Sequence, residues 1–92
     1  MSLQEKYDDA YKNAKLLNGG NRQDQLDFYG WAKVASGADF AEAKKPGIWD
    51  LEGKYKYGAW EKVVTAGLTK QQAQEEYVTR YEKLKNEHGL KA

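Results

Sequence analysis

The sequence predicts an all-α protein built as a four-helix bundle. Apolar residues recur at helical spacing in four segments, and glycine and proline separate these segments. No segment alternates apolar with polar residues as a half-buried strand does. A chain of 92 residues is long enough for one modest core and too short for two. We therefore expect a single domain over residues 1–92, with short connections between most of its helices.

The first helix is expected from about residue 3 to residue 17. Asn18-Gly19-Gly20 ends it, because glycine readily adopts the left-handed conformation that closes many helices. The helix carries a stripe of residues three or four apart, which are Leu3, Tyr7, Ala10, Tyr11, Ala14 and Leu17. This stripe predicts one face turned toward the core.

The second helix is expected to begin after Asn21 and to continue to about Ser36. The Asn21 side chain can cap the first turn, where the charge of Asp24 also suits the helix dipole. One side of this helix carries Leu26, Tyr29, Lys33 and Ser36, and another carries Phe28, Trp31 and Ala35. Apolar groups on two sides predict contact with more than one neighbouring helix.

The longest break between helices covers residues 37–49 and contains Pro46-Gly47. A loop of this length in a small domain usually packs and often has a function. We expect Ile48, Trp49 and Leu51 to anchor it against the bundle. Asp50 stands where the N-cap of the next helix is expected.

The third helix is expected over about residues 51–64. Tyr57, Trp60 and Val64 lie three and four residues apart, and this spacing predicts its buried face. Gly53 and Gly58 weaken the helix, each by about 1 kcal/mol relative to alanine.

The fourth helix is expected over about residues 70–87 and ends at Gly89. Thr69 followed by Gln72 is a capping box, which is a fairly specific start signal. The predicted buried stripe of this helix consists of Ala73, Tyr77, Arg80, Tyr81 and Leu84.

The charge balance and the composition disfavour several function classes. Fifteen basic and fourteen acidic residues give a net charge of +1, whereas a nucleic-acid-binding protein usually has a clear basic excess. No stretch reaches the length of a membrane-spanning helix, and the first residues lack the apolar core of a signal peptide. We therefore expect a cytoplasmic protein that binds no nucleic acid.

The sequence also lacks the residue patterns of the common catalytic and metal sites. It has no cysteine and one histidine, His88, which lies at the end of the last predicted helix. The usual zinc sites, the calcium-binding loops, the phosphate-binding glycine loops and the nucleophile motifs do not occur. We expect neither an enzyme nor a bound metal or cofactor.

Aromatic and cationic side chains are paired one helical turn apart. The pairs are Tyr11 with Lys15, Tyr29 with Lys33, Lys56 with Trp60, and Tyr77 with Arg80. A ring can stack on a flat base while an ammonium group pairs with a phosphate. Spacing alone is weak evidence that these pairs bind a ligand with a flat base and phosphates. Lysine stems commonly lie along aromatic rings, and tyrosines at helical spacing are usually part of the core.

Three parts of the chain resemble the acyl-CoA-binding proteins. They are Tyr29-Gly30-Trp31-Ala32-Lys33-Val34-Ala35-Ser36-Gly37, Lys45-Pro46-Gly47, and Asp50-Leu51-Glu52-Gly53-Lys54-Tyr55-Lys56-Tyr57-Gly58-Ala59-Trp60. The family pattern has a Tyr and a Lys four apart, a Pro-Gly, and a Lys followed four residues later by a Trp. Residues 69–84, centred on Tyr77, fit the last helix of the family, so the resemblance covers nearly the whole chain.

This resemblance implies a fold and a function. Members of the family are bundles with an up-down-down-up arrangement, and they bind one medium- to long-chain fatty acyl-CoA ester per protein in a surface bowl. They act as monomeric intracellular carriers and pool formers, with transient contacts to membranes or to enzymes that use acyl-CoA.

The resemblance also assigns roles to residues of this sequence. It implies that Tyr29 packs on the adenine and that Lys33 and Lys56 hold the ribose 3′-phosphate and the neighbouring phosphates. Tyr77 would close the nucleotide side of the pocket. The remaining assignments are a phosphate contact for Lys15 and the lining of the bowl for Ala10 and Leu26.

The sequence departs from the family pattern at a few positions. Ala32 stands where many members have a second Tyr, and the neighbouring Trp31 either compensates for it or belongs to the core. Glu52 replaces a lysine that is common in that neighbourhood, which removes one phosphate contact. Tyr57 replaces the usual Trp. These changes leave the main contacts in place and put the acyl-chain preference in doubt.

Two other functions remain open at this point. One is a helical protein–protein interaction module whose aromatic residues are all core or interface. The other is a regulatory domain of a larger enzyme, which the placement of helical signals from residue 3 to about residue 90 disfavours. Titration with an acyl-CoA separates a carrier from an interaction module.

Overall fold

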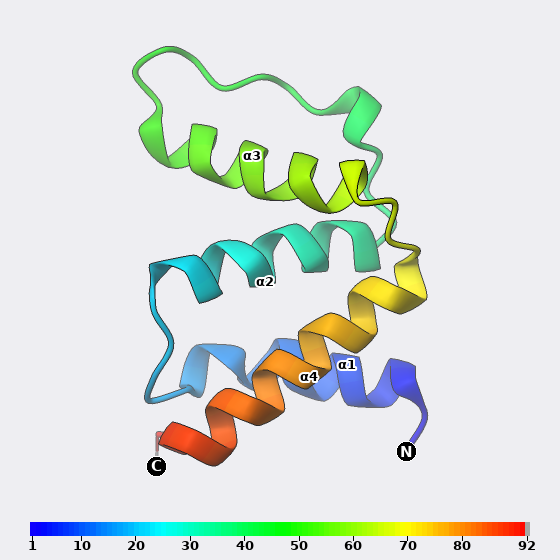
Figure 1. The fold of residues 1–92 in the computed structure, drawn as a ribbon, viewed down its shortest axis with the longest axis vertical. Coiled ribbons are helices and arrows are strands. Elements are labelled where there is room, and N and C mark those ends of the chain that lie inside the picture. The colour runs from blue at the N-terminus through cyan, green and yellow to red at the C-terminus, as the bar shows by residue number, and fades with distance from the viewer. Residues whose placement is uncertain (92) are drawn as a thin grey trace.

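The computed structural model describes residues 1–91, which form four α-helices and two short 3₁₀ turns (Figure 1). The helices are α1 (Leu3–Asn13), α2 (Arg22–Ala35), α3 (Leu51–Thr65) and α4 (Lys70–His88), and the turns are η1 (Ala14–Leu16) and η2 (Phe40–Glu42). The helices α2 and α3 run in one direction, and α1 and α4 run in the other. The predicted four-helix bundle with up-down-down-up order is therefore confirmed.

Polar caps start the helices where the sequence predicts them. The Asn21 side chain accepts a hydrogen bond of 2.9 Å from the backbone N–H of Asp24 at the start of α2. The Thr69 hydroxyl accepts one of 3.1 Å from the N–H of Gln72 at the start of α4. Asp50 caps α3. Such caps satisfy backbone donors that have no partner inside the helix, so these starts are encoded locally.

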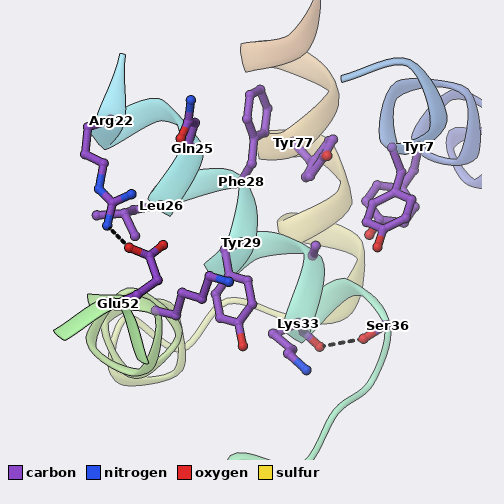
Figure 2. Close-up of a pocket in the computed structure, with 13 residues that line it drawn as sticks. Tyr7, Arg22, Gln25, Leu26, Phe28, Tyr29, Lys33, Ser36, Glu52 and Tyr77 are labelled. Carbon is purple, nitrogen blue, oxygen red and sulfur yellow. Dashed lines mark hydrogen bonds and ion pairs between the residues drawn. The ribbon is translucent and has the colours of Figure 1, made fainter. Parts of the chain in front are cut away.

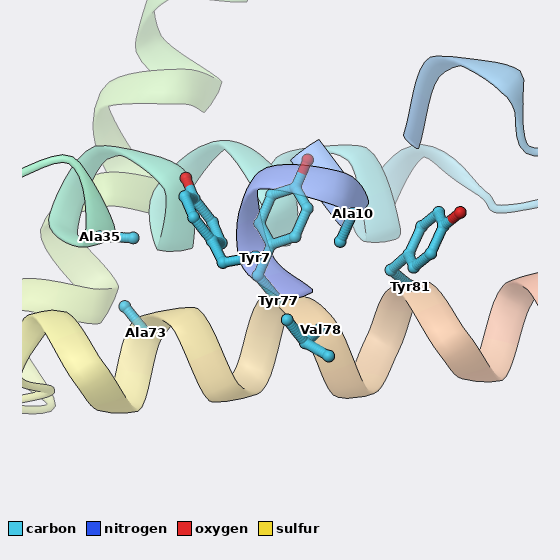
Figure 3. Close-up of a cluster of buried hydrophobic side chains, with 7 residues drawn as sticks. All are labelled: Tyr7, Ala10, Ala35, Ala73, Tyr77, Val78 and Tyr81. Atoms are coloured by element: carbon cyan, nitrogen blue, oxygen red, sulfur yellow. The ribbon is translucent and has the colours of Figure 1, made fainter. Parts of the chain in front are cut away.

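The core lies where α1 and α2 pack on α4 (Figure 3). Its buried side chains are Tyr7, Ala10, Ala35, Ala73, Tyr77, Val78 and Tyr81. The rings of Tyr7 and Tyr77 meet edge to face with their centroids 5.2 Å apart, a geometry that adds about 0.5–1.5 kcal/mol beyond area burial. Most of the large groups are aromatic, so tyrosine rings supply much of the apolar area.

Gly30 sets the distance between α2 and α3. A Cβ atom at this position would lie 2.6 Å from the carbonyl oxygen of Ala59 and 2.9 Å from Cγ2 of Val63. Because Gly30 docks there, Val63 is buried whereas Val64 is 41% exposed. The prediction that Val64 belongs to the buried face was therefore wrong by one residue, while Trp60 is buried as predicted.

The loop between α2 and α3 packs through Phe40 and not through the predicted anchors. The Phe40 ring lies 4.9 Å from the ring of Tyr57 and 5.0 Å from the ring of Trp60. Ile48, Trp49 and Leu51 are 71%, 89% and 63% exposed, which corrects the expectation that they anchor the loop. The Phe40 ring already covers the face of α3 that carries Tyr57 and Trp60, so Ile48 and Trp49 do not pack there and stay exposed to solvent.

The helix α1 ends earlier than predicted because the chain turns there to meet the C-terminal segment. Leu17 and Leu90 form an isolated antiparallel bridge, in which Asn18 N–H donates to the Gly89 carbonyl at 3.0 Å. The turn η1 provides the transition from helix to extended backbone. Among the described residues, none of the helices is both long enough and apolar enough to cross a membrane.

Arg80 joins α4 to α2 through an ion-pair network. Its guanidinium donates to Asp24 Oδ1 at 2.6 Å and to Asp27 Oδ2 at 3.2 Å, and it lies 5.2 Å from the centre of the Trp31 ring. Arg80 was expected in the buried stripe beside Tyr77, but it pairs with residues of α2. The N–H of Asn21 and the Arg80 guanidinium together lower the pKa of the Asp24 carboxyl below its ordinary value of 3.8.

We expect Asp24→Asn to lower the free energy of unfolding at pH 7 by about 1–2 kcal/mol, because a part-buried charge-assisted hydrogen bond is lost. A lowered folded-state pKa contributes stability above the unfolded value of 3.8, and this contribution is lost as the pH falls below 3.8. Denaturation of both proteins between pH 7 and pH 2.5 measures the difference. Glu76→Gln, at an exposed position of α4, is the control. A difference in the free energy of unfolding that does not shrink as the pH falls below 3.8 contradicts the assignment.

Candidate functional site

A hollow of about 760 Å³ opens on the surface where α1, α2, α3 and α4 meet (Figure 2). All four helices contribute side chains to it. Its lining consists of Tyr7, Tyr11, Arg22, Gln25, Leu26, Phe28, Tyr29, Ala32, Lys33, Ser36, Glu52, Lys56 and Tyr77.

The helix α2 supplies one wall of the hollow. Its lining residues recur three and four positions apart from residue 22 to residue 36, so they lie along one face of the helix. Glu52 and Lys56, four apart on α3, stand opposite this face. The close α2–α3 contact at Gly30 holds the two walls at a fixed distance.

Lys33, Lys56 and Tyr29 converge between α2 and α3. The Nζ atoms of Lys33 and Lys56 each lie 5.6 Å from the centre of the Tyr29 ring, so the ring stands beside two cations. Lys33 Nζ also lies 5.3 Å from the centre of the Trp60 ring. The sequence paired Lys56 with Trp60, whereas the structure brings Lys56 to Tyr29 and Lys33 to Trp60.

Phenol and phenyl rings form the inner end of the hollow. The rings of Phe28 and Tyr77 lie 4.5 Å apart, and the Tyr7 ring approaches Tyr77 from α1 (Figure 2). Burial raises the pKa of the Tyr77 hydroxyl well above its ordinary value, and the nearby Tyr7 and Tyr11 raise it further. Tyr77 therefore stays neutral near pH 7 and presents a ring and a hydroxyl without charge.

An ion pair crosses the rim at the opposite end. The Arg22 guanidinium of α2 donates to Glu52 Oε2 of α3, and both side chains are half exposed (Figure 2). This hydrogen bond lowers the pKa of the Glu52 carboxyl. Arg22 also lies 5.5 Å from the centre of the Tyr55 ring. The acidic residue at this rim is thus neutralised by a partner on the facing helix.

The predicted site residues divide into three groups. Leu26, Tyr29, Lys33, Lys56 and Tyr77 line the same hollow. Lys15 lines an adjoining hollow of about 370 Å³, which shares Gln25, Phe28 and Tyr77 with the first. Ala10 is 1% exposed and belongs to the core between α1 and α4. It does not line the hollow, which corrects the role that the resemblance implied for it.

The departures from the family pattern have structural outcomes. Ala32 lines the hollow, where its small side chain leaves space. Trp31 packs against the core and under the Arg80 guanidinium, which supports the assignment of this residue to the core.

Sequence reasoning missed Arg22, Gln25 and Tyr7 as lining residues. For Arg22 and Gln25 a signal exists, because they precede Tyr29 by seven and four positions and so lie on its face of α2. Tyr7 offers no such signal, since its position depends on how α1 crosses α4.

The geometry suits a ligand with both anionic and apolar parts. Two ammonium groups beside an aromatic ring can bind a phosphate next to a flat base, and the phenyl, phenol and leucine groups can contact apolar atoms. Within residues 1–91, histidine and acidic side chains do not gather in a group of three that could hold a metal ion.

Comparison with known proteins gives consistent matches over nearly the full length. A family model described as "Acyl CoA binding protein" matches residues 4–81. The acyl-CoA-binding protein homolog of Manduca sexta is 42% identical over 91 residues, which is 98% of this chain and 99% of that protein. The acyl-CoA-binding protein homolog 1 of Caenorhabditis elegans is 36% identical over 84 residues, or 90% of this chain and 94% of that protein.

A solved structure agrees with these matches. The crystal structure of Oryza sativa acyl-CoA-binding protein 2 superposes with a TM-score of 0.80 at 31% identity, and the match covers 94% of this chain and 93% of that chain.

Proposed function

Since the chain belongs to the acyl-CoA-binding protein family, we propose that it binds medium- to long-chain fatty acyl-CoA esters, one per protein. It acts as an intracellular carrier that keeps a pool of these esters and passes them on without altering them. The observation that carries this proposal is the convergence of Lys33 and Lys56 on the Tyr29 ring at the wall of the hollow.

The head of the ligand binds through charge and stacking. We assign the adenine to the Tyr29 ring and the phosphates to Lys33 and Lys56, whose Nζ atoms both lie 5.6 Å from the centre of that ring. Coenzyme A carries about four negative charges, so these cations provide both attraction and orientation. Lys15, in the adjoining hollow, can contact a phosphate that extends past Tyr77.

The apolar part of the hollow receives the remainder of the ligand. Leu26 lines it directly, and Tyr77 closes its inner end. Ala10 acts beneath the surface by letting α1 pack closely on α4. Each methylene of the acyl chain that is buried adds up to about 0.8 kcal/mol, so affinity rises with chain length.

The carrier is further proposed to work as a cytoplasmic monomer. The hollow is formed within one chain, so binding of the ligand needs no second subunit. Sedimentation of the protein with and without ligand tests the monomer, and the distribution of a tagged protein between cell fractions tests the compartment.

Titration calorimetry with palmitoyl-CoA, free CoA and palmitate tests the proposed function. We expect one site per chain and the tightest binding for palmitoyl-CoA, because only this ligand uses both the cations and the apolar lining. The proposal is contradicted if the titration with palmitoyl-CoA gives no heat and the ligand leaves the thermal midpoint of the protein unchanged.

We expect Glu52→Gln to tighten palmitoyl-CoA binding by about two- to fivefold, because it removes the anionic partner of Arg22 and leaves that guanidinium uncompensated at the rim of a site for phosphates. Salt screens exposed charges, so the gain should shrink as ionic strength rises. Glu61→Gln, an equal charge change at an exposed position of α3 outside the hollow, is the matched control. Equal gains in both variants mean that net charge, and not the position of Glu52, is responsible.

A further inference from the structure

The adjoining hollow brings together two lysines that lie far apart in the chain. It has a volume of about 370 Å³ and shares Gln25, Phe28 and Tyr77 with the main hollow. Lys15 lines it from the turn η1, and Lys91 lines it from the segment that follows α4. The family resemblance implies a phosphate contact for Lys15 and assigns no role to Lys91.

A backbone bridge holds Lys91 beside η1. Gly89 ends α4 with a φ of 76° and a ψ of 178°, a conformation that glycine adopts far more readily than other residues. The chain then runs back along the end of η1, where Asn18 N–H donates to the Gly89 carbonyl at 3.0 Å. On the other side of the bridge, Lys91 N–H donates to the Leu16 carbonyl at 2.7 Å. The position of Lys91 is therefore set by the fold.

The bridge is anchored on the side of α2 that faces away from α3. Leu17 and Leu90, the two bridged residues, are partly buried and pack against the core, whereas the neighbouring Lys91 is exposed. In Figure 1 the light blue turn after α1 and the red end of α4 lie on one side of α2, and α3 lies on the other. Lys15 and Lys91 are therefore separated by α2 from Lys56 of α3.

The adjoining hollow offers positive charge without an equal number of available anions. Among the described residues that line it, Asp24 is the one acidic residue, and its Oδ1 already accepts a hydrogen bond of 2.6 Å from Arg80. None of the salt bridges found within residues 1–91 involves Lys15 or Lys91. An anion bound between these two lysines would be attracted by both ammonium groups.

We propose that Lys91 binds phosphate together with Lys15, that the backbone bridge places it there, and that this pair holds the diphosphate of the coenzyme A head. The inference rests on the proposed function, which puts the adenine on Tyr29. Coenzyme A has two phosphate centres, the ribose 3′-phosphate and the diphosphate. A head that lies along the residues shared by the two hollows leaves the 3′-phosphate to Lys33 and Lys56 and brings the diphosphate to the other pair.

Titration calorimetry with palmitoyl-CoA tests the role of Lys91. Lys91→Gln is expected to weaken binding by about two- to fivefold, the usual effect of an exposed charge pair, and to make the affinity less sensitive to salt. Its thermal midpoint without ligand should stay unchanged, because the side chain is exposed. Lys62→Gln, an equal charge change outside both hollows, is the matched control. The proposal is overturned if the two variants bind palmitoyl-CoA equally well.

A ligand without the ribose phosphate distinguishes the two phosphate centres. With 3′-dephospho-palmitoyl-CoA, Lys56→Ala should lose most of its effect on affinity, because the phosphate assigned to that lysine is missing. Lys91→Gln should weaken binding of this ligand by the same factor as binding of palmitoyl-CoA. If the effect of Lys91→Gln disappears instead, Lys91 contacts the ribose phosphate and the assignment to the diphosphate is overturned.

Gly89→Ala tests whether the bridge acts by placing Lys91. Alanine is strained in this conformation, so the segment after α4 should leave η1. We expect Gly89→Ala to weaken palmitoyl-CoA binding as much as Lys91→Gln does, and the two substitutions together to weaken it no further. An additional loss in the combined variant would mean that the bridge acts on the site in another way, which contradicts this part of the proposal.

Inorganic pyrophosphate separates the inference from the proposed function. In ¹⁵N-labelled protein it should shift the backbone amide signals of Lys15 and Lys91 and leave that of Lys62 in place. If palmitoyl-CoA does not bind while pyrophosphate shifts these two signals, the proposed function is lost and the phosphate site is still supported. If palmitoyl-CoA binds normally while neither ligand shifts the Lys91 signal, the inference is overturned and the proposed function stands.

Discussion

Gly30→Ala is expected to lower the free energy of unfolding by about 1–3 kcal/mol, the usual cost of overpacking a close contact. The added methyl group would stand 2.6 Å from the carbonyl oxygen of Ala59 and 2.9 Å from Cγ2 of Val63. The first of these atoms belongs to helical backbone, so α2 and α3 must move apart. Each kcal/mol corresponds to a fall of about 4–8 °C in Tm for a domain of this size.

The same displacement should weaken ligand binding, because it moves Lys56 away from Tyr29 and Lys33. Thermal denaturation and palmitoyl-CoA calorimetry on the same samples measure both effects. Gly58→Ala is the matched control on α3: no atom lies within 4 Å of a Cβ there, so alanine should stabilise the helix by up to about 1 kcal/mol. A Gly30→Ala protein as stable as the wild type would show that the helices do not meet as closely as described.

Lys56→Ala is expected to weaken palmitoyl-CoA binding by about 10- to 150-fold while leaving the thermal midpoint nearly unchanged. A hydrogen bond to a charged group contributes about 1.5–3 kcal/mol, which converts to this range of Kd. The folded protein loses little, because the Lys56 side chain is exposed and contacts the Tyr29 ring without a salt bridge among those found in residues 1–91. Calorimetry and thermal melts on one preparation measure both quantities.

Lys62→Ala removes an equal charge from the exposed last turn of α3 and controls for net charge. It should change affinity only slightly, and this change should disappear as salt is added. Tyr29→Ala should resemble Lys56→Ala in losing affinity, since it removes the ring that both cations approach. If Lys56→Ala lost stability and kept affinity, Lys56 would be a structural residue and the phosphate site would have to lie elsewhere.

The sequence alone determined that there are four helices and where α2, α3 and α4 begin. Asn21 with Asp24, Asp50, and Thr69 with Gln72 form caps by hydrogen bonds that span three residues, so nothing distant is needed to predict them. The shared face of Tyr29 and Lys33 follows in the same way from the helical repeat. The motif between Lys45 and Trp60 was specific enough to indicate the family without any tertiary structure.

Only the tertiary structure decided which groups on different helices meet. Lys56 stands beside Tyr29 instead of Trp60, Val63 is buried instead of Val64, and Ala10 lies beneath the hollow. The contact of Gly30 with Ala59 fixes how α3 is rotated against α2, and Phe40 occupies the place left for Ile48 and Trp49. These choices depend on packing between residues far apart in the chain, which helical periodicity within one segment does not encode.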